Sequence, residues 1–232
     1  MVHLYLIPSW FLGYDIGLEL VFAIITLIVS IFAFKVYKLS EQRQPKLFST
    51  AFLFISMAYF CKAFLNFLVL SKLNENISVA LKIASVSTLN FIGVYFYIIL
   101  LSIGLVTLAY MTFRVRNAKI YSLLLIIAVM YLFFTSNPLL PYHIISSILL
   151  VYIFIHYLFN YIGKKRINTM LVLIAFGLLL FGNIHFMFSV VSQEFSFLNS
   201  ELYYVIAHFL ELVAYLLILT NLILIIKNEH KK

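Results

Sequence analysis

Charged residues are scarce in this chain, and their scarcity limits what the protein can be. Of its 232 residues, only 10% are charged and 65% are hydrophobic, and the mean hydropathy is +1.10. A soluble domain is about 45–50% apolar and about 25% charged, so a globular core could not bury this much apolar surface. The composition therefore predicts an integral membrane protein, one domain over 1–232, whose outer surface contacts the lipid bilayer.

Cysteine, glycine and proline are also rare. Cys61 is the only cysteine, which excludes an intramolecular disulfide, a thiolate metal cluster and CxxC redox chemistry. All four prolines lie at the ends of apolar runs or between them, so the interrupted helices of many secondary transporters are absent. Enzyme fingerprints such as GxSxG, HExxH and the P-loop are absent too, and no catalytic residue is predicted. Ser146 and Ser147, close to His143, are expected to form helix–helix hydrogen bonds.

Seven apolar runs have about the length that a transmembrane helix needs, which is roughly 20 residues. We expect helices at about 15–37, 47–70, 81–113, 119–136, 141–162, 167–191 and 201–227. The fourth run is short, but Asn137, Pro138 and Pro141 break any continuous helix between it and the fifth. The predicted fold is therefore an all-α membrane protein, a bundle of seven transmembrane helices.

Basic residues gather in alternate loops and set the expected orientation. Thirteen of them follow the first, third, fifth and seventh predicted helices: Lys35, Lys38, Arg43, Lys46, Arg114, Arg116, Lys119, Lys164, Lys165, Arg166, Lys227, Lys231 and Lys232. The opposite loops hold Lys72, Lys82, Glu75, Glu194 and Glu201. The positive-inside rule places the first side in the cytoplasm, and hence the N-terminus outside the cell membrane. Topology thus explains the net charge of +8 without a nucleic-acid partner.

Ionisable side chains within the predicted helices are distributed unevenly. An ionised group at the centre of a bilayer costs about 3 kcal/mol or more, so each is a candidate functional residue. In the expected orientation they fall in the outer half of the membrane, with Asp15 near the headgroups, whereas the inner half is nearly all apolar. The candidate ligand-binding residues are Asp15, Glu19, Lys62, Asn66, His185, His208, Glu211 and Tyr215. They predict an outward-facing polar pocket between helices 1, 2, 6 and 7.

Three interpretations of these polar residues remain open. They could be buried ion pairs that fix helix register, such as Lys62 with Glu19 or Glu211. They could line a pocket for a small molecule or ion that arrives from the outer side. They could also form a metal or proton site from Glu19, His185, His208 and Glu211, because zinc and iron bind these residue types. If either histidine lies near Glu211, its protonation between about pH 5 and 7 should alter binding or stability.

The preferred function is that of a sensor or receptor-like protein that binds a small ligand or ion. A proton or cation transporter or channel is the alternative, and a metal-dependent membrane enzyme is the second alternative. The short loops leave no room for a soluble signalling module, so a sensor would act through a homo-oligomer or a partner membrane protein. The sequence does not identify the ligand.

In length, helix number, outside N-terminus and short loops, the chain resembles a microbial-rhodopsin-type or stand-alone seven-helix sensor domain. The last predicted helix has no lysine in its core, since Lys227 lies at its end, so a retinal Schiff base is not expected. His143, His156, His185 and His208 do not pair at matching depths on facing helices, so haem is not expected either. No other cofactor is indicated.

Overall fold

In a computed structural model of the protein, all regular structure within the described residues is α-helical. The described residues are 11–73, 86–113, 117–130, 134–135, 138–194 and 200–229. Six helices are long and apolar enough to cross a membrane: α1 (Leu12–Ser40), α2 (Arg43–Leu73), α4 (Val86–Thr112), α6 (Leu139–Lys164), α7 (Ile167–Glu194) and α8 (Ser200–Glu229). The chain is therefore a multi-pass membrane protein.

The remaining helix, α5, differs from the others. It spans Ala118–Met130, and its 13 residues give a length of only about 20 Å, against about 30 Å of hydrocarbon. The helix expected over 119–136 does not include Phe134, which lies in a turn, or Thr135, which is not helical. Pro138 has no N–H to donate to the carbonyl oxygen of Phe134, four residues earlier, so a helical hydrogen bond is lost there. The first residues of the third predicted helix, 81–85, lie outside the described part of the chain.

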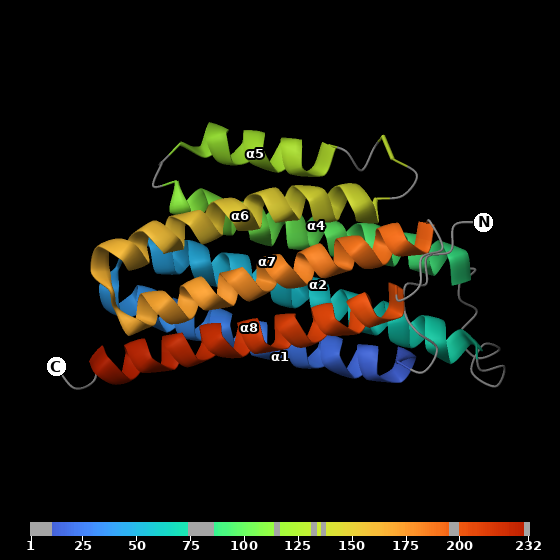
Figure 1. Ribbon diagram of the computed structural model, residues 1–232, viewed down its shortest axis with the longest axis horizontal. Coiled ribbons are helices and arrows are strands. Elements are labelled where there is room, and N and C mark those ends of the chain that lie inside the picture. Colours follow the sequence, from blue (N-terminus) through green and yellow to red (C-terminus); the bar gives the residue numbers. More distant parts are fainter. Residues whose placement is uncertain are drawn as a thin grey trace.

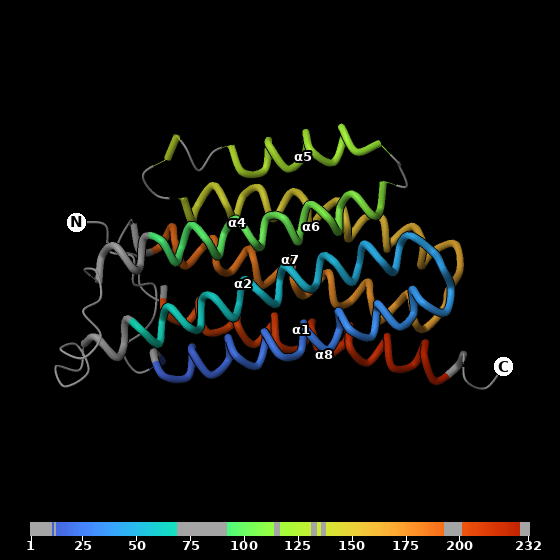
Figure 2. Tube along the Cα trace, turned by 180° about the vertical axis from the view of Figure 1, so that it is seen from behind, coloured from blue at the N-terminus to red at the C-terminus, as the bar shows by residue number. Residues whose placement is uncertain are grey.

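The six long helices form a ring. α1 packs against α2, α2 against α4, α4 against α6, α6 against α7, and α7 against α8, and α8 returns to α1. α6, α7 and α8 form the face seen in Figure 1, and α1, α2 and α4 form the face seen from behind in Figure 2. α5 lies outside this ring against α4. The first and last helices are therefore neighbours, although they are far apart in the sequence.

Two glycines allow neighbouring helices to approach closely. A Cβ atom on Gly104 of α4 would lie 2.7 Å from Ile55 Cγ1 and 3.1 Å from the carbonyl oxygen of Ala51 on α2. A Cβ atom on Gly182 of α7 would lie 3.3 Å from the carbonyl oxygen of Ala207 on α8. Small residues at such contacts are typical of membrane helix pairs, which gain their stability from close packing.

Tight turns connect the helices at one end of the bundle. Glu41 ends α1 with φ of 54°, and its N–H donates to the Tyr37 carbonyl oxygen; Lys165 ends α6 with φ of 47°, and its N–H donates to the Tyr161 carbonyl oxygen. This left-handed conformation is a common helix C-cap, and it lets the chain reverse within a few residues.

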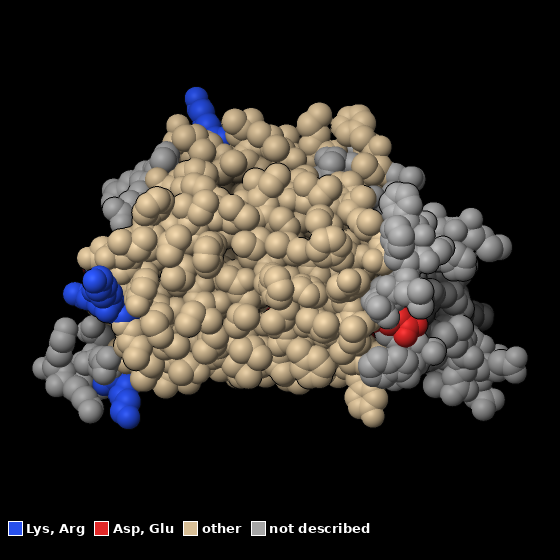
Figure 3. All heavy atoms as spheres, viewed as in Figure 1, with Lys and Arg blue, Asp and Glu red and all other residues tan. Residues whose placement is uncertain are grey.

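This end of the bundle also carries the positive charge. Of the lysines and arginines that the structure describes, all except Lys62 and Lys72 of α2 lie here: Lys35, Lys38, Arg43, Lys46, Lys119, Lys164, Lys165, Arg166 and Lys227. Figure 3 shows a broad uncharged band between these residues and the opposite end. We call this end of the molecule the basic end.

Candidate functional site

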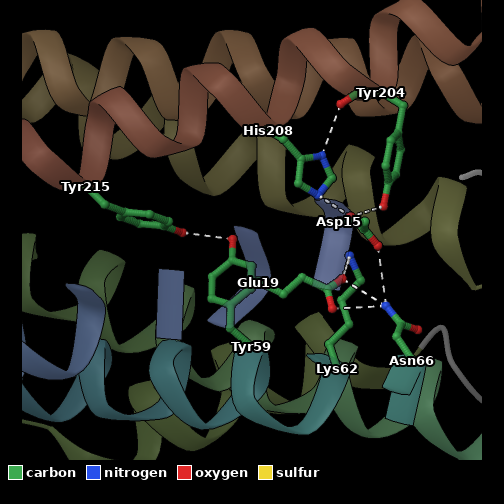
Figure 4. A network of polar contacts seen from close by, with 8 residues as sticks. All are labelled: Asp15, Glu19, Tyr59, Lys62, Asn66, Tyr204, His208 and Tyr215. Atoms are coloured by element: carbon green, nitrogen blue, oxygen red, sulfur yellow. Dashed lines mark hydrogen bonds and ion pairs between the residues drawn. The ribbon is translucent and has the colours of Figure 1, made fainter. Parts of the chain in front are cut away.

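Six polar side chains meet at the end of the bundle opposite the basic end, and we call them the charged cluster. They come in three pairs spaced four residues apart: Asp15 and Glu19 on α1, Lys62 and Asn66 on α2, and Tyr204 and His208 on α8. Residues four apart lie on the same face of a helix, so each helix presents both members of its pair to the others. Figure 4 shows the cluster where α1, α2 and α8 meet.

Glu19 holds the first half of the charged cluster together. Its side chain is completely buried, and its Oε1 lies 2.7 Å from the Nζ of Lys62. Asn66 Nδ2 lies 3.0 Å from both Glu19 carboxylate oxygens, which makes it the donor to that carboxylate. The Lys62 ammonium also lies 5.1 Å from the centroid of the Tyr97 ring, where a cation is attracted to the aromatic face. Glu19 is thus neutralised by a lysine on the neighbouring helix.

Asp15 holds the second half. Its Oδ1 accepts a hydrogen bond of 2.9 Å from the Tyr204 hydroxyl and lies 3.0 Å from Nε2 of His208. Its other oxygen, Oδ2, lies 3.5 Å from Asn66 Nδ2, which joins the two halves of the cluster. The second ring nitrogen of His208, Nδ1, lies 3.0 Å from the carbonyl oxygen of Tyr204. Both nitrogens of this imidazole therefore face oxygen atoms.

The two oxygen contacts of His208 determine where the protons of this side chain and of Asp15 lie. A carbonyl oxygen only accepts hydrogen bonds, so the Nδ1 of His208 must carry a hydrogen. Nε2 then either carries a second hydrogen or accepts one from a protonated Asp15. In both cases the pair holds one proton more than a neutral histidine and an ionised aspartate. With that proton and the charge of Lys62, the two carboxylates of the cluster are balanced.

Aromatic rings enclose His208 and keep water away from it. The ring centroids of Phe186, Phe22 and Phe11 lie 5.0, 5.9 and 6.0 Å from that of the imidazole. The side chains of Asp15 and His208 are 0% and 1% exposed. A side chain with no accessible surface has no room for a water molecule beside it, so ion pairs, and not open space, occupy this part of the expected pocket.

His185 lies outside the charged cluster. Its Nδ1 bonds to the carbonyl oxygen of Phe181, one turn earlier in α7, at 2.8 Å. Its ring packs against Phe181 and Tyr203, with centroids 4.5 and 5.9 Å away. The structure therefore does not bring His185 together with His208, although both were expected to line the same outward-facing pocket.

Tyr215 and Glu211 lie deeper along α8. The hydroxyls of Tyr215 and Tyr59 are 3.0 Å apart, and both residues are buried. Together with Glu211, Tyr142 and other residues they line a cavity of about 30 Å³, which has room for about one or two water molecules. Glu211 is half-buried and is adjacent to this tyrosine pair, but it does not belong to the charged cluster.

The residues that could hold a metal ion differ from the set expected from the sequence, which was Glu19, His185, His208 and Glu211. Asp15, Glu19 and His208 each offer a ligand atom, and these atoms all lie within 4.8 Å of one another. Two carboxylates and an imidazole are suitable ligands for zinc or iron. However, the Lys62 ammonium and the His208 ring already contact these carboxylates, so a metal ion would have to displace them.

A separate set of hydrogen bonds joins α6 to α7. Asn183 Nδ2 donates to the His143 carbonyl oxygen at 2.8 Å and to the Ser147 hydroxyl at 2.7 Å. Asn183 Oδ1 accepts from the Ser146 hydroxyl at 2.9 Å and from the His143 ring at 2.8 Å. The expectation that Ser146 and Ser147 make helix–helix hydrogen bonds is confirmed.

Tyr204 is the member of the charged cluster that was not among the sequence candidates. Tyrosine is common at membrane interfaces, so its type alone carried no signal. Its position four residues before His208 did carry one, because it places Tyr204 on the same helix face. Asp15 was expected near the headgroups, where its charge would matter little, yet it is fully buried in the cluster.

Comparisons of the chain with protein families, with curated proteins and with solved structures find no match. No residue role can therefore be transferred from a relative. What the chain does has to be inferred from the geometry of its own polar groups.

Proposed function

We propose that this chain is a proton-binding sensor of the cell membrane, with seven transmembrane helices, an outside N-terminus and a cytoplasmic C-terminus. The orientation is supported by the basic end, which the positive-inside rule places in the cytoplasm. The seventh crossing is supported by connectivity: α5 begins at the basic end, near Lys119, and α6 begins at the opposite end, near Leu139. The chain between these points has about the 20 residues that a crossing needs.

The observation that carries the proposal is the position of His208 between two acceptors. Loss of the shared proton would leave a lone pair of the His208 imidazole facing an oxygen at 3.0 Å, either the Asp15 carboxylate or the Tyr204 carbonyl. Two acceptors at this distance repel, and no water reaches the buried ring, so the imidazole would have to turn and the contact between α1 and α8 would have to repack. A buried histidine whose charge state alters helix packing is a common pH-sensing device.

The polar groups between the charged cluster and the basic end favour sensing over transport. Within the described part of the chain, their hydroxyls bond to nearby groups and do not form a continuous proton path: Ser56 donates to the Ala23 carbonyl oxygen, and Ser30 and Ser49 bond to each other. A sensor of this size would pass its signal through a second copy or a partner membrane protein.

Divalent metal binding at the same place is the second candidate, supported by the three clustered ligand atoms of Asp15, Glu19 and His208. Metal binding here would release the shared proton, since the ligating nitrogen of a histidine must be unprotonated. Elemental analysis of the purified protein tests it: stoichiometric zinc or iron that is lost in Asp15→Asn would support this candidate, and its absence would eliminate it.

Proton uptake by vesicles containing the purified protein tests the main proposal. After a step from an alkaline pH, at which the shared proton has left, down to pH 7, the wild type should take up one proton per chain that His208→Gln does not take up. His185→Gln is the matched control and should behave as the wild type, because His185 lies outside the charged cluster. Equal uptake by the wild type and His208→Gln would overturn the proton site. Sustained proton flux across sealed vesicles, lost in His208→Gln, would establish transport in place of sensing.

A further inference from the structure

Glu211 is a carboxyl group in the middle of a membrane-spanning helix, and it lies outside the charged cluster. It follows Ser200, the first residue of α8, by 11 positions, which places it about 16 Å along this helix of 30 residues. It lines the small cavity of about 30 Å³ to which α2, α4, α6, α7 and α8 contribute residues. A Cβ atom on Gly182 of α7 would lie 3.8 Å from Glu211 Cγ, so the stem of the side chain packs where α7 and α8 meet.

No basic side chain among the described residues balances Glu211. The ion pairs of this region are Lys62 with Glu19 and His208 with Asp15, and Glu211 forms none. Lys62 and the shared proton of the charged cluster already balance its two carboxylates. Without that shared proton the region would be more negative still. An ionised Glu211 would therefore be an uncompensated charge in the hydrocarbon, which is the state that membrane helices avoid.

The neighbours of Glu211 suit a neutral carboxylic acid. The Tyr59 hydroxyl hydrogen-bonds to the Glu211 carboxyl group and also lies 3.0 Å from the Tyr215 hydroxyl. A hydroxyl both donates and accepts, so Tyr59 can serve both partners at once. The Phe22 ring covers the tyrosines, with centroids 5.3 Å from Tyr59 and 5.9 Å from Tyr215. The three groups thus form a short chain of hydrogen bonds beside a cavity that holds one or two water molecules at most.

The other titratable groups around Glu211 do not supply a positive charge to it. Tyr97 on α4 and Tyr142 on α6 are neutral hydroxyls, and the facing polar residue of α7 is Asn183, which does not titrate. The remaining groups belong to the charged cluster and pair with one another: Asp15, Lys62 and His208.

We propose that Glu211 is a second proton-binding site, which holds its proton at pH 7 as a neutral carboxylic acid hydrogen-bonded to Tyr59. The site shares no residue with the charged cluster, so it does not depend on the proton that we assign to His208 and Asp15. It places a second proton on α8, three residues after His208, where this helix faces α2. Loss of the proton would put a charge beside Tyr59 and Tyr215 and would draw water into the cavity between the helices.

Infrared spectroscopy of the purified full chain at pH 7 tests the proposal. A protonated carboxyl group gives a band that shifts when H₂O is replaced by D₂O, and Glu211→Gln should remove this band. Glu201→Gln is the matched control and should retain it, because Glu201 is exposed at the beginning of α8. His208→Gln and Asp15→Asn should retain it too, so failure of the proposed function would leave this result unchanged. A wild-type spectrum with no band that Glu211→Gln removes would overturn the proposal.

Unfolding at a series of pH values gives a second test. A glutamate in water releases its proton at about pH 4.3, so the unfolded chain loses this proton while the folded protein retains it. The stability that the proton contributes is greatest below that pH and falls as the pH rises. Between pH 5 and 7, the unfolding equilibrium constant of the wild type should rise about tenfold per pH unit relative to that of Glu211→Gln. Altered packing in the variant adds a constant offset and leaves this slope readable.

Two results of the unfolding series would overturn the proposal. A constant difference between the wild type and Glu211→Gln from pH 5 to 7 would show that Glu211 is ionised in the folded protein. Stabilisation by sodium chloride, but not by choline chloride, that Glu211→Gln loses would show that a bound cation balances Glu211 in place of a proton.

Discussion

The imidazole of His208 and the carboxylate of Asp15 meet at 3.0 Å, with neither side chain reaching solvent. This contact joins the beginning of α8 to the beginning of α1, and it therefore closes the ring of six long helices at the end opposite the basic end. The side chain pair that we propose as the proton site therefore lies at the contact that closes the bundle.

Removing the lysine of the Glu19 ion pair should destabilise the protein strongly. Lys62→Met leaves a fully buried carboxylate without its counter-charge, and losses of about 3–5 kcal/mol are typical when one partner of a buried pair is removed. Lys62→Met combined with Glu19→Gln should recover most of that loss, because no unpaired charge remains. Thermal unfolding in detergent measures both. If the double variant were no more stable than the single one, the ion pair would not be the reason for the loss.

Tyr204→Phe should destabilise the protein by about 1–2 kcal/mol, because it removes a donor to the buried Asp15 carboxylate. The adjacent Tyr203→Phe is a matched control, since Tyr203 packs against His185 and Phe188 away from the charged cluster. Unfolding temperatures of the two variants should differ clearly. Equal effects would show that the Tyr204 hydroxyl contributes nothing specific.

The buried asparagines Asn183 and Asn221 should respond in opposite ways to leucine. Asn183→Leu breaks four hydrogen bonds between α6 and α7 and should cost about 2–4 kcal/mol. Asn221→Leu replaces an amide whose oxygen has no hydrogen-bond partner among the described residues, so it should leave the stability unchanged or raise it. Unfolding temperatures of both variants, measured side by side, test this contrast. A larger loss for Asn221→Leu than for Asn183→Leu would contradict it.

Gly104→Ala and Gly17→Ala should change the stability of the protein in opposite directions. The first places a methyl group 2.7 Å from Ile55 and 3.1 Å from a backbone oxygen, so α2 and α4 must move apart, at a cost of about 1–3 kcal/mol. The second meets nothing within 4 Å and should stabilise helix α1 by about 0.5–1 kcal/mol. The unfolding temperatures of both variants test this prediction. If Gly104→Ala left the stability unchanged, α2 and α4 would not be so closely packed.

Helix positions and the faces of individual helices could be predicted from the sequence, but the neighbours of each helix could not. Spacing of four residues correctly grouped Asp15 with Glu19 and Lys62 with Asn66. His185 was grouped with His208 because both lie in the outer half of the membrane, yet that does not give the direction in which a side chain leaves its helix. His185 turns toward Tyr203 instead.

A cavity of about 330 Å³ at the basic end shows a second limit of the sequence. Asn221, which lines it, was one of two adjacent polar residues, with Thr220, in the otherwise apolar last part of its predicted helix. Other lining residues, such as Gln42 and Lys164, come from a turn and a helix end that only the ring arrangement brings near it. Long-range packing of this kind leaves no periodic pattern in the sequence.

Nitrogen-15 NMR of histidine-labelled protein at pH 7, combined with infrared spectroscopy of the carboxyl groups, measures the shared proton most directly. His208→Gln assigns the His208 signals, and Asp15→Asn assigns the carboxyl band. We expect either a His208 imidazolium with hydrogens on both nitrogens or a protonated Asp15 carboxyl band, with one such proton per chain. A neutral His208 beside an ionised Asp15 would contradict the proton-binding site on which the proposed function depends.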